Sequence, residues 1–270
     1  MIKLIALDID GTLVNHALQF SPRVKQAIAR ALETGLIVTL ATGRGPSPTD
    51  YFAEQLGLTA PLVTLQGGVI YDYRRRLTLH ETRLAPEVIP WIAAEARARG
   101  WHLHFETTDM VYMPYGLETP SELAALFRVA NLTRVKDFLT QMPETPHKFI
   151  VSVREPAERE GVRQELARLV RAAGLPLDVF PSHPILVEAL PAGIHKASGL
   201  AWLARQLNIA PGEALAVGDN DNDLTMLKWA GVGVAMGSDS PAALAAADWI
   251  APGLDEDGAA VAIEKYALNA

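Results

Sequence analysis

The chain has no cysteine among its 270 residues. This absence excludes disulfide bonds, thiolate zinc sites and a cysteine nucleophile, so any bound metal would need oxygen or imidazole ligands. No apolar run approaches the roughly 20 residues that span a bilayer. The first apolar run carries Lys3 and then meets acidic residues, which is not the layout of a signal peptide. We therefore expect a cytoplasmic protein with no membrane partner.

Long basic segments are also absent, and the formal net charge is −7. Proteins that bind nucleic acid neutralise its phosphates with clustered Lys and Arg, so a nucleic-acid partner is not expected. Hydrophobic residues make up 49% of the chain and charged residues 20%, which is typical of a protein with a substantial core. The length fits one large domain or two modest ones. A negatively charged substrate would need a metal or individual basic side chains to compensate its charge.

Two carboxylates follow the first apolar run of the sequence. The run Ile2–Leu7 is almost continuously apolar, as in a buried strand of a parallel sheet, and Asp8, Asp10 and Gly11 come next. In open α/β sheets, ligands bind beyond the carboxyl ends of the strands. Two close carboxylates repel each other unless a cation or a shared proton compensates their charge, so a metal site is indicated. The alternative is that this segment is only a turn.

Strands and helices alternate at both ends of the chain, and the middle follows a different pattern. Apolar strand candidates at 36–41, 61–65, 214–217 and 232–235, with helices between them, predict a Rossmann-like parallel sheet. Residues 69–73 and 77–80 are typical of a hairpin. The middle contains helix candidates at 86–99, 121–129 and 156–173 and strand candidates at 101–106, 110–113, 148–153, 177–180 and 185–190. This pattern predicts an inserted α+β domain.

Further polar residues of suitable type follow other strands or precede a helix: Thr42, Lys196, Asp219, Asn222 and Asp223. A parallel sheet would bring them to the edge that carries Asp8 and Asp10. Three carboxylates with water suit a hard octahedral cation, so Mg²⁺ is the expected cofactor. Such a cation, a lysine and a threonine hydroxyl can hold a phosphate. One carboxylate can then attack phosphorus, while a second transfers protons.

Each of these segments also has a simpler interpretation. Thr42–Arg44 could be only a turn at the start of a helix, and Lys196 could be a solvated surface charge. Gly218–Asp223 could be an acidic loop or part of a calcium loop, although it lacks the EF-hand glycine and terminal glutamate. The conjunction of all the segments is more specific than any one of them.

Taken together, these segments resemble the haloacid dehalogenase-like (HAD) phosphohydrolases, and within them the Cof-type group with a large cap. Asp8-Ile9-Asp10-Gly11-Thr12-Leu13 matches the first motif of the family, Thr42 the second, Lys196 the third and Gly218–Asp223 the fourth. The resemblance implies an α/β core domain, residues 1–82 and 184–270, and an α+β cap domain, residues 83–183. In this family the cap closes over the site, excludes water and selects the leaving group.

The resemblance also implies roles for the acidic residues. Asp8 would be the nucleophile and a Mg²⁺ ligand. Asp10 would be the general acid/base and would bind Mg²⁺ through its backbone carbonyl. Asp219 would be the third protein ligand of the metal, and Asp223 would support the site without binding the metal.

The remaining motif residues would bind the substrate. The resemblance implies that Thr42 and Lys196 hold the phosphoryl oxygens and that Lys196 pairs with Asp8. Asn222 would approach the phosphate, while Gly43 and Arg44 would line the entrance.

These interpretations predict a Mg²⁺-dependent phosphatase for a small phosphorylated metabolite such as a sugar phosphate, acting as a monomer or homodimer. A phosphomutase and a non-catalytic phosphate- or metal-binding protein of the same fold are the alternatives. The group usually has Asn where this chain has Gln66 and Ser238, which weakens any transfer of substrate preference. Candidates for substrate selection in the cap are His102, His104, Glu106, Tyr112 and Lys148, although these residues are more simply interpreted as ordinary cap surface.

Overall fold

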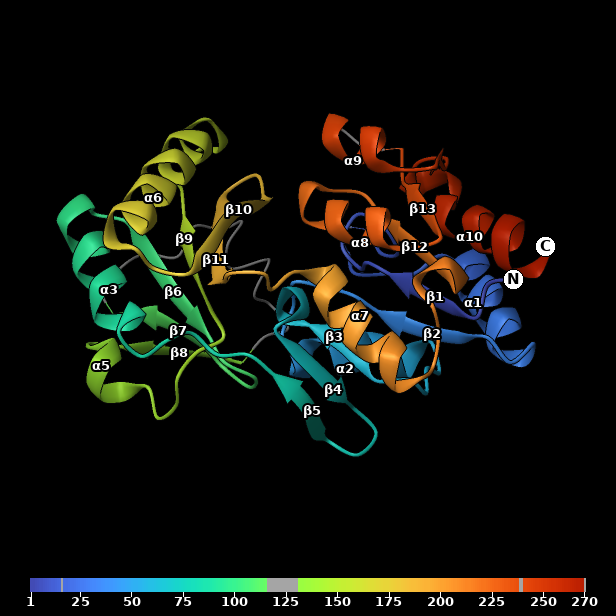
Figure 1. Ribbon diagram of the computed structural model, residues 1–270, viewed down its shortest axis with the longest axis horizontal. Helices are drawn as coiled ribbons and strands as arrows, with labels where there is room; N and C mark the ends of the chain where they lie inside the picture. The colour runs from blue at the N-terminus through green and yellow to red at the C-terminus, as the bar shows by residue number, and fades with distance from the viewer. Residues whose placement is uncertain (16, 116–130, 238–239, 270) are drawn as a thin grey trace. The chain divides into compact units, whose positions relative to one another are not determined.

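The computed structural model describes residues 1–15, 17–115, 131–237 and 240–269, and the chain forms two compact units (Figure 1). The first unit comprises Met1–Arg44, Thr49–His80 and His195–Ala270. The second unit comprises Gly45–Pro48 and Glu81–Ile194. The helix predicted at 121–129 and the residue Ser238 lie outside the described residues. No helix that the structure describes is long and apolar enough to cross a membrane.

A parallel sheet of five strands forms the centre of the first unit, in the order β14-β13-β12-β1-β2 (Figure 1). Its strands are β1 (Leu4–Leu7), β2 (Ile37–Leu40), β12 (Ala214–Gly218), β13 (Val232–Ala235) and β14 (Trp249–Ile250). All neighbouring pairs are parallel. Every residue of β1 is buried because β12 and β2 pair with it on either side and helices cover both faces. The predicted parallel sheet is confirmed.

Helices cover the two faces of this sheet, and alternate residues of β1 face alternate layers. Ile5 and Leu7 pack in one cluster with residues of α1 and α10, whereas Ala6 packs with residues of α7 and α8 in another. The helices are α1 (Pro22–Glu33), α2 (Pro46–Gln55), α7 (Lys196–Gln206), α8 (Leu224–Trp229), α9 (Pro241–Ala246) and α10 (Gly258–Ile263). Ser21 caps the N-terminus of α1, and its hydroxyl accepts from the backbone N–H of Val24 at 3.1 Å.

The third strand does not simply extend the parallel sheet, contrary to the prediction. β3 (Leu62–Thr64) pairs antiparallel with β4 (Val69–Asp72), and β4 neighbours β5 (Leu77–Glu81) in a small sheet of its own. One parallel bridge, Ala41 to Val63, still joins β3 to the end of β2. The difference arises because the chain reverses at Leu65–Gly67, so that β4 pairs with β3. The predicted hairpin is confirmed as β4 and β5.

The second unit is built on a six-stranded sheet in the order β10-β11-β9-β6-β7-β8. Its strands are β6 (His102–Glu106), β7 (Val111–Pro114), β8 (Leu132–Val135), β9 (Lys148–Ser152), β10 (Leu177–His183) and β11 (Leu186–Pro191). Its helices are α3 (Val88–Arg99), α5 (Phe138–Gln141) and α6 (Arg159–Ala173). Apolar residues of α3 and α6 pack against one face of the sheet. The predicted inserted α+β arrangement is confirmed, while β8 and α5 were not predicted.

The boundaries of the second unit differ from the expected 83 and 183. β11 pairs antiparallel with β10 and β9, so this strand belongs to the second unit, which continues to Ile194. The sequence pattern had already grouped the strand candidate 185–190 with the inserted segment, and only the boundary implied by the resemblance, at residue 183, left it out. β7 and β8 pair in parallel, whereas the other pairs of this sheet are antiparallel.

Candidate active site

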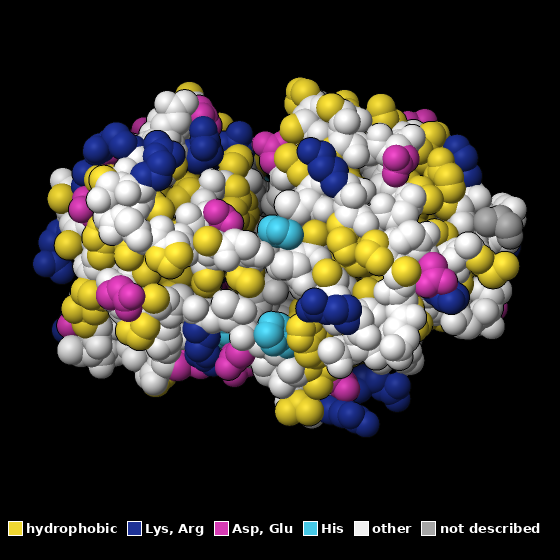
Figure 2. Space-filling view, viewed as in Figure 1, with side chains coloured by type: hydrophobic (Ala, Val, Ile, Leu, Met, Phe, Trp, Pro, Cys, Tyr) yellow, Lys and Arg dark blue, Asp and Glu magenta, His cyan; other side chains and the backbone are white. Residues whose placement is uncertain are grey.

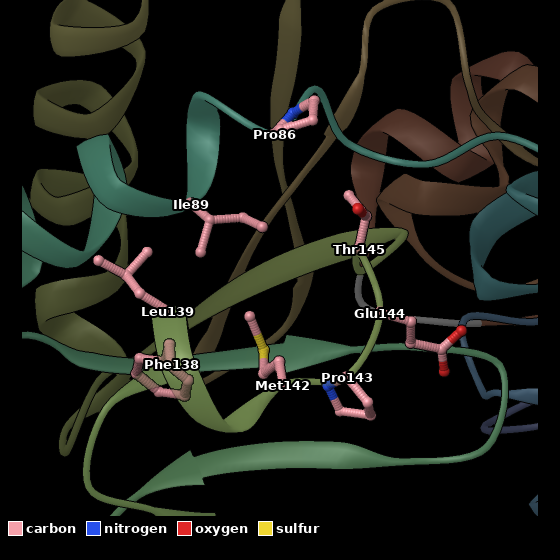
Figure 3. Close-up of a pocket in the computed structure, with 8 residues that line it drawn as sticks. All are labelled: Pro86, Ile89, Phe138, Leu139, Met142, Pro143, Glu144 and Thr145. Carbon is pink, nitrogen blue, oxygen red and sulfur yellow. The ribbon is translucent and has the colours of Figure 1, made fainter.

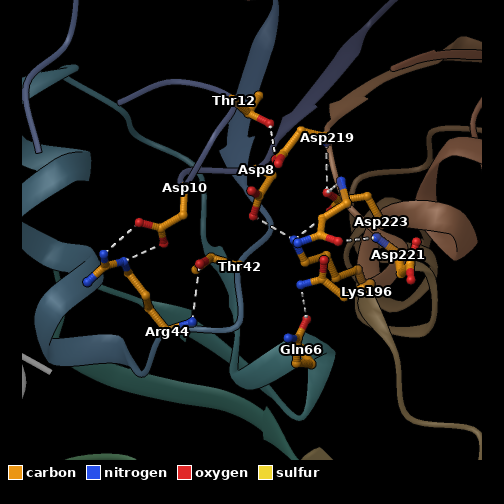
Figure 4. A network of polar contacts seen from close by, with 12 residues as sticks. Asp8, Asp10, Thr12, Thr42, Arg44, Gln66, Lys196, Asp219, Asp221 and Asp223 are labelled. Carbon is orange, nitrogen blue, oxygen red and sulfur yellow. Dashed lines mark hydrogen bonds and ion pairs between the residues drawn. The ribbon is translucent and has the colours of Figure 1, made fainter. Parts of the chain in front are cut away.

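Asp8 and Asp219 are brought together where β1 and β12 end. The backbone N–H of Asp8 donates to Val217 of β12 at 3.0 Å, and the chain then turns at Gly11, whose φ is +82°. A Cβ on Gly11 would overlap the carboxylate of Asp219, so glycine is needed both for the turn and for the close approach. Thr12 Oγ1 donates to Asp219 Oδ1 at 2.9 Å (Figure 4). The Asp8–Thr12 segment is therefore more than a turn.

A buried lysine joins three parts of the site. Lys196 is the first residue of α7, and its Nζ donates to Asp8 Oδ1 at 2.5 Å and to Asp223 Oδ1 at 2.6 Å (Figure 4). Its side chain has no exposed surface, so its interpretation as a solvated surface charge is wrong. The other oxygen of Asp223 accepts from the backbone N–H groups of Asp219 and Asn220, both at 3.0 Å. Asp223 thus fixes the loop that presents Asp219.

Three carboxylates of the site could hold a metal ion. Asp8, Asp219 and Asp223 each offer an oxygen, and these atoms all lie within 4.8 Å of one another. Both oxygens of Asp223 already accept hydrogen bonds, so Asp8 and Asp219 are better suited as ligands. Oxygen ligands of this kind match Mg²⁺. The donor set therefore fits the expected cation.

Electrostatics also favour a bound cation. Burial raises the pKa of Asp8 well above its ordinary value, and neighbouring carboxylates add to the effect of burial while Lys196 opposes it. Burial and Asp223 raise the pKa of Asp219 to about 7. Burial alone would lower the pKa of Lys196, but Asp223 and Asp8 outweigh it and raise this pKa. One buried ammonium therefore faces three carboxylates, and a divalent cation would supply the missing positive charge.

Asp10 is held in an ion pair that the sequence did not indicate. Arg44 Nε donates to Asp10 Oδ2 at 2.7 Å, and Arg44 Nη2 donates to Asp10 Oδ1 at 2.6 Å. The carboxylate of Asp10 points toward Arg44 and away from Lys196 (Figure 4). The guanidinium also lies over the ring of Phe52, 5.3 Å from its centroid. Arg44 was predicted only to line the entrance.

The segment Thr42–Arg44 is tied to the rest of the site through its backbone and through Gln66. Buried Thr42 accepts at its hydroxyl from the backbone N–H of Arg44 at 3.1 Å. Asn222 Nδ2 donates to Gln66 Oε1 at 3.2 Å. A Cβ on Gly43 would lie 2.6 Å from Gln66 Nε2, so the Gln66 amide packs directly against Gly43. Sequence reasoning noted Gln66 only as a departure from the family pattern, although its place directly after a strand was a usable signal.

The five candidates for substrate selection lie on β6, β7 and β9 of the second unit. His104, Glu106, Tyr112 and Lys148 are buried, so the interpretation of these four as ordinary surface residues is wrong, whereas His102 is half-buried. Lys148 Nζ donates to Glu188 at 2.9 Å and lies 3.3 Å from Glu106. His104 Nε2 and Ser152 Oγ are 2.8 Å apart. These polar groups are structural partners of one another within the sheet of the second unit.

Comparison with known proteins agrees with this arrangement. The sequence model of the haloacid dehalogenase-like hydrolase family matches residues 5–263. The chain therefore belongs to the haloacid dehalogenase-like hydrolases, as the motifs predicted.

Its similarity to individual members extends over nearly the whole chain. The 5-amino-6-(5-phospho-D-ribitylamino)uracil phosphatase YcsE of Bacillus subtilis (strain 168) is 31% identical over 272 residues, which cover 99% of this chain and 96% of that protein. Phosphatase YwpJ of the same strain is 31% identical over 283 residues, with 96% and 97% covered. The crystal structure of a haloacid dehalogenase-like hydrolase from Bacteroides thetaiotaomicron, 31% identical, superposes with a TM-score of 0.85 and covers 98% of this chain and 99% of that one.

Proposed function

We propose that this protein is a Mg²⁺-dependent phosphatase that hydrolyses a small phosphorylated metabolite, such as a sugar phosphate, through an aspartyl-phosphate. The observation that carries the proposal is the buried carboxylate of Asp8, which Lys196 contacts at 2.5 Å beside Asp219. A carboxylate fixed in this way suits a nucleophile, because its neighbours hold its orientation and limit its hydration.

The chemistry divides between two carboxylates. Mg²⁺ bound by Asp8 and Asp219 would neutralise charge on the phosphoryl oxygens. Asp8 attacks phosphorus through one carboxylate oxygen, and the bond from phosphorus to the leaving oxygen breaks. Asp10 gives its proton to that oxygen, then takes a proton from the water that attacks the aspartyl-phosphate. Inorganic phosphate leaves, and both carboxylates return to their starting states.

Lys196 and Arg44 contribute positive charge at different places. The ammonium of Lys196 stays beside Asp8 and offers its remaining N–H to a phosphoryl oxygen. Both oxygens of Asp10 accept from Arg44, so this ion pair has to open or shift before Asp10 can carry a proton.

Hydrolysis is favoured over the phosphomutase alternative because YcsE and YwpJ, both 31% identical to this chain, are named phosphatases. The name of the first describes a phosphorylated ribitylamino compound, which supports a phosphate ester on a sugar-like chain as the substrate class. Product analysis with a sugar phosphate and a bisphosphate primer would separate the two reactions: a phosphatase releases inorganic phosphate and a mutase returns it to sugar. The assignment of substrate selection to the second unit stays a prediction.

The test is phosphate release from p-nitrophenyl phosphate and from a panel of sugar phosphates, with Mg²⁺ and with EDTA. We expect turnover only with Mg²⁺ and none in Asp8→Asn. The exposed Asp255 of the first unit supplies a matched control, and Asp255→Asn should retain wild-type turnover. Wild-type rates in Asp8→Asn would refute the mechanism.

A further inference from the structure

The turn between β3 and β4 has an unusual backbone. Leu65 and Gln66 have φ values of 48° and 59°, and Gly67 follows with a φ of 96°. Residues other than glycine seldom adopt this left-handed region, and two in succession are held there only when the surroundings impose it. Both side chains are buried, at 0% and 2% exposure. The surroundings that hold this turn belong to the candidate active site.

Main-chain contacts connect the turn to two segments of the site. The backbone N–H of Leu65 donates to Arg44 O, and that of Gln66 donates to Thr42 O, both at 2.9 Å. A Cβ on Gly67 would overlap the carbonyl of His195, so the turn packs closely against the residue that precedes Lys196. The turn therefore fixes the spacing between the Thr42 hydroxyl and the start of α7.

The Gln66 side chain reaches a third segment. Its Oε1 accepts from Asn222 Nδ2 at 3.2 Å, and its Nε2 packs against Gly43. Within the described part of the chain, no hydrogen bond donated by Gln66 Nε2 is found. Gln66 thus lies between two of the residues that the motifs predict to bind phosphate, Asn222 and Gly43.

We propose that Gln66 is a positioning residue of the phosphoryl subsite, which acts by orienting the Asn222 amide and the Gly43 backbone. The proposal rests on the proposed function, since it assigns Asn222 to the phosphate. A neutral amide suits this place because Asp8, Asp219 and Asp223 already concentrate negative charge nearby. A carboxylate at position 66 would repel an incoming phosphate.

Gln66→Gly separates this role from a structural one. Glycine adopts a left-handed backbone without strain, so the variant loses the amide while the turn itself becomes easier to form. We expect the Kd of inorganic phosphate in Mg²⁺, measured by titration calorimetry, to rise roughly three- to tenfold, the loss expected for one neutral hydrogen bond. KM should rise by a similar factor, and the thermal midpoint should stay close to that of the wild type.

Asn222→Ala and the double variant test whether Gln66 acts through Asn222. If it does, the two losses of phosphate affinity are less than additive, because the part of the Gln66 effect that runs through Asn222 is already lost in Asn222→Ala. Additive losses would overturn the proposal. Gln66→Asn keeps an amide and tolerates the same backbone, so its affinity should fall between those of the wild type and Gln66→Gly. Should Gln66→Gly not fold, the Gln66→Asn and Asn222→Ala pair gives the same cycle.

Arg76 provides a matched control because it has a φ of 51° in the turn between β4 and β5. Arg76→Gly relieves the same kind of backbone and should leave phosphate binding and KM unchanged. Wild-type phosphate affinity in Gln66→Gly would refute the positioning role while leaving the phosphatase intact. A wild-type protein that binds phosphate without turnover would instead refute the proposed function, and the affinity cycle would still decide the role of Gln66.

Discussion

Removing the divalent cation should make the stability of the first unit fall as the pH rises. In the metal-free protein, burial and Asp223 raise the pKa of Asp219 from its ordinary value of 3.8 to about 7. The folded state then binds this proton more tightly than the unfolded chain does. The free energy of unfolding is therefore higher in acid and decreases as the pH rises from about 4 to about 7.

The size of the effect follows from the shift. A change of roughly three pKa units at about 1.36 kcal/mol each corresponds to about 4 kcal/mol over the full range, and to about 3 kcal/mol between pH 5 and pH 8. Bound Mg²⁺ should remove this loss, because the cation takes the place of the proton. Asp219→Asn carries no charge at either pH, and its amide oxygen can still accept from Thr12. The variant should therefore be more stable than the wild type at pH 8 without metal.

Scanning calorimetry in EDTA and in Mg²⁺, at pH 5 to 8, measures this prediction. Asp219→Asn should lose the part of the pH slope that Asp219 contributes and the stabilisation by Mg²⁺, and it should be inactive; the slope that remains comes from Asp8, whose pKa burial also raises. Asp255→Asn, an exposed acid of the same unit, should keep both. The reasoning is refuted if the metal-free wild type is equally or more stable at pH 8 than at pH 5.

Three further variants test other parts of the structure. Lys196→Met leaves the carboxylate of Asp8 without its buried partner. It should destabilise the metal-free protein at pH 8 by about 3–5 kcal/mol, with a smaller loss at pH 5. Urea unfolding that shows no loss of stability would contradict the buried pairing. Asp10→Asn should lower turnover roughly 10²- to 10⁴-fold, while the Mg²⁺ affinity measured by calorimetry stays unchanged. An equally large loss of Mg²⁺ affinity would contradict the observation that the Asp10 side chain points to Arg44. Burial lowers the pKa of His104 to about 3, so the unfolded state gains a proton that the folded state excludes, and stability falls below about pH 6.5. At pH 5 this loss is about 2 kcal/mol. The prediction is refuted if His104→Gln loses stability in acid as steeply as the wild type does.

The local signals of the sequence predicted much of the core. A continuous apolar run indicates a strand buried on both faces, and its end is where ligands bind in a parallel sheet. Asp8, Thr42 and Asp219 each stand at such an end, so their meeting followed once the sheet was predicted. Lys196 belongs to the same argument because it begins a helix at that edge.

Assignments of strands to sheets could not be made in this way. β3 and β8 are short, and their residue patterns fit either a parallel or an antiparallel neighbour. Only the structure shows that β3 pairs antiparallel with β4 and that β8 pairs in parallel with β7. Strands pair with partners that are far away in the sequence, and the periodicity within one strand does not indicate which partner it will pair with.

By itself, the sequence determined which carboxylates and which lysine form the candidate site, because each follows from a local motif at a strand end or helix start. Only the tertiary structure decided how they are held. Arg44 reaches Asp10 across 34 residues, and Asn222 reaches Gln66 across 156. Such contacts depend on side-chain rotamers and on backbone turns such as the left-handed Leu65–Gly67 segment, which are set by packing against distant residues rather than by neighbours in the chain.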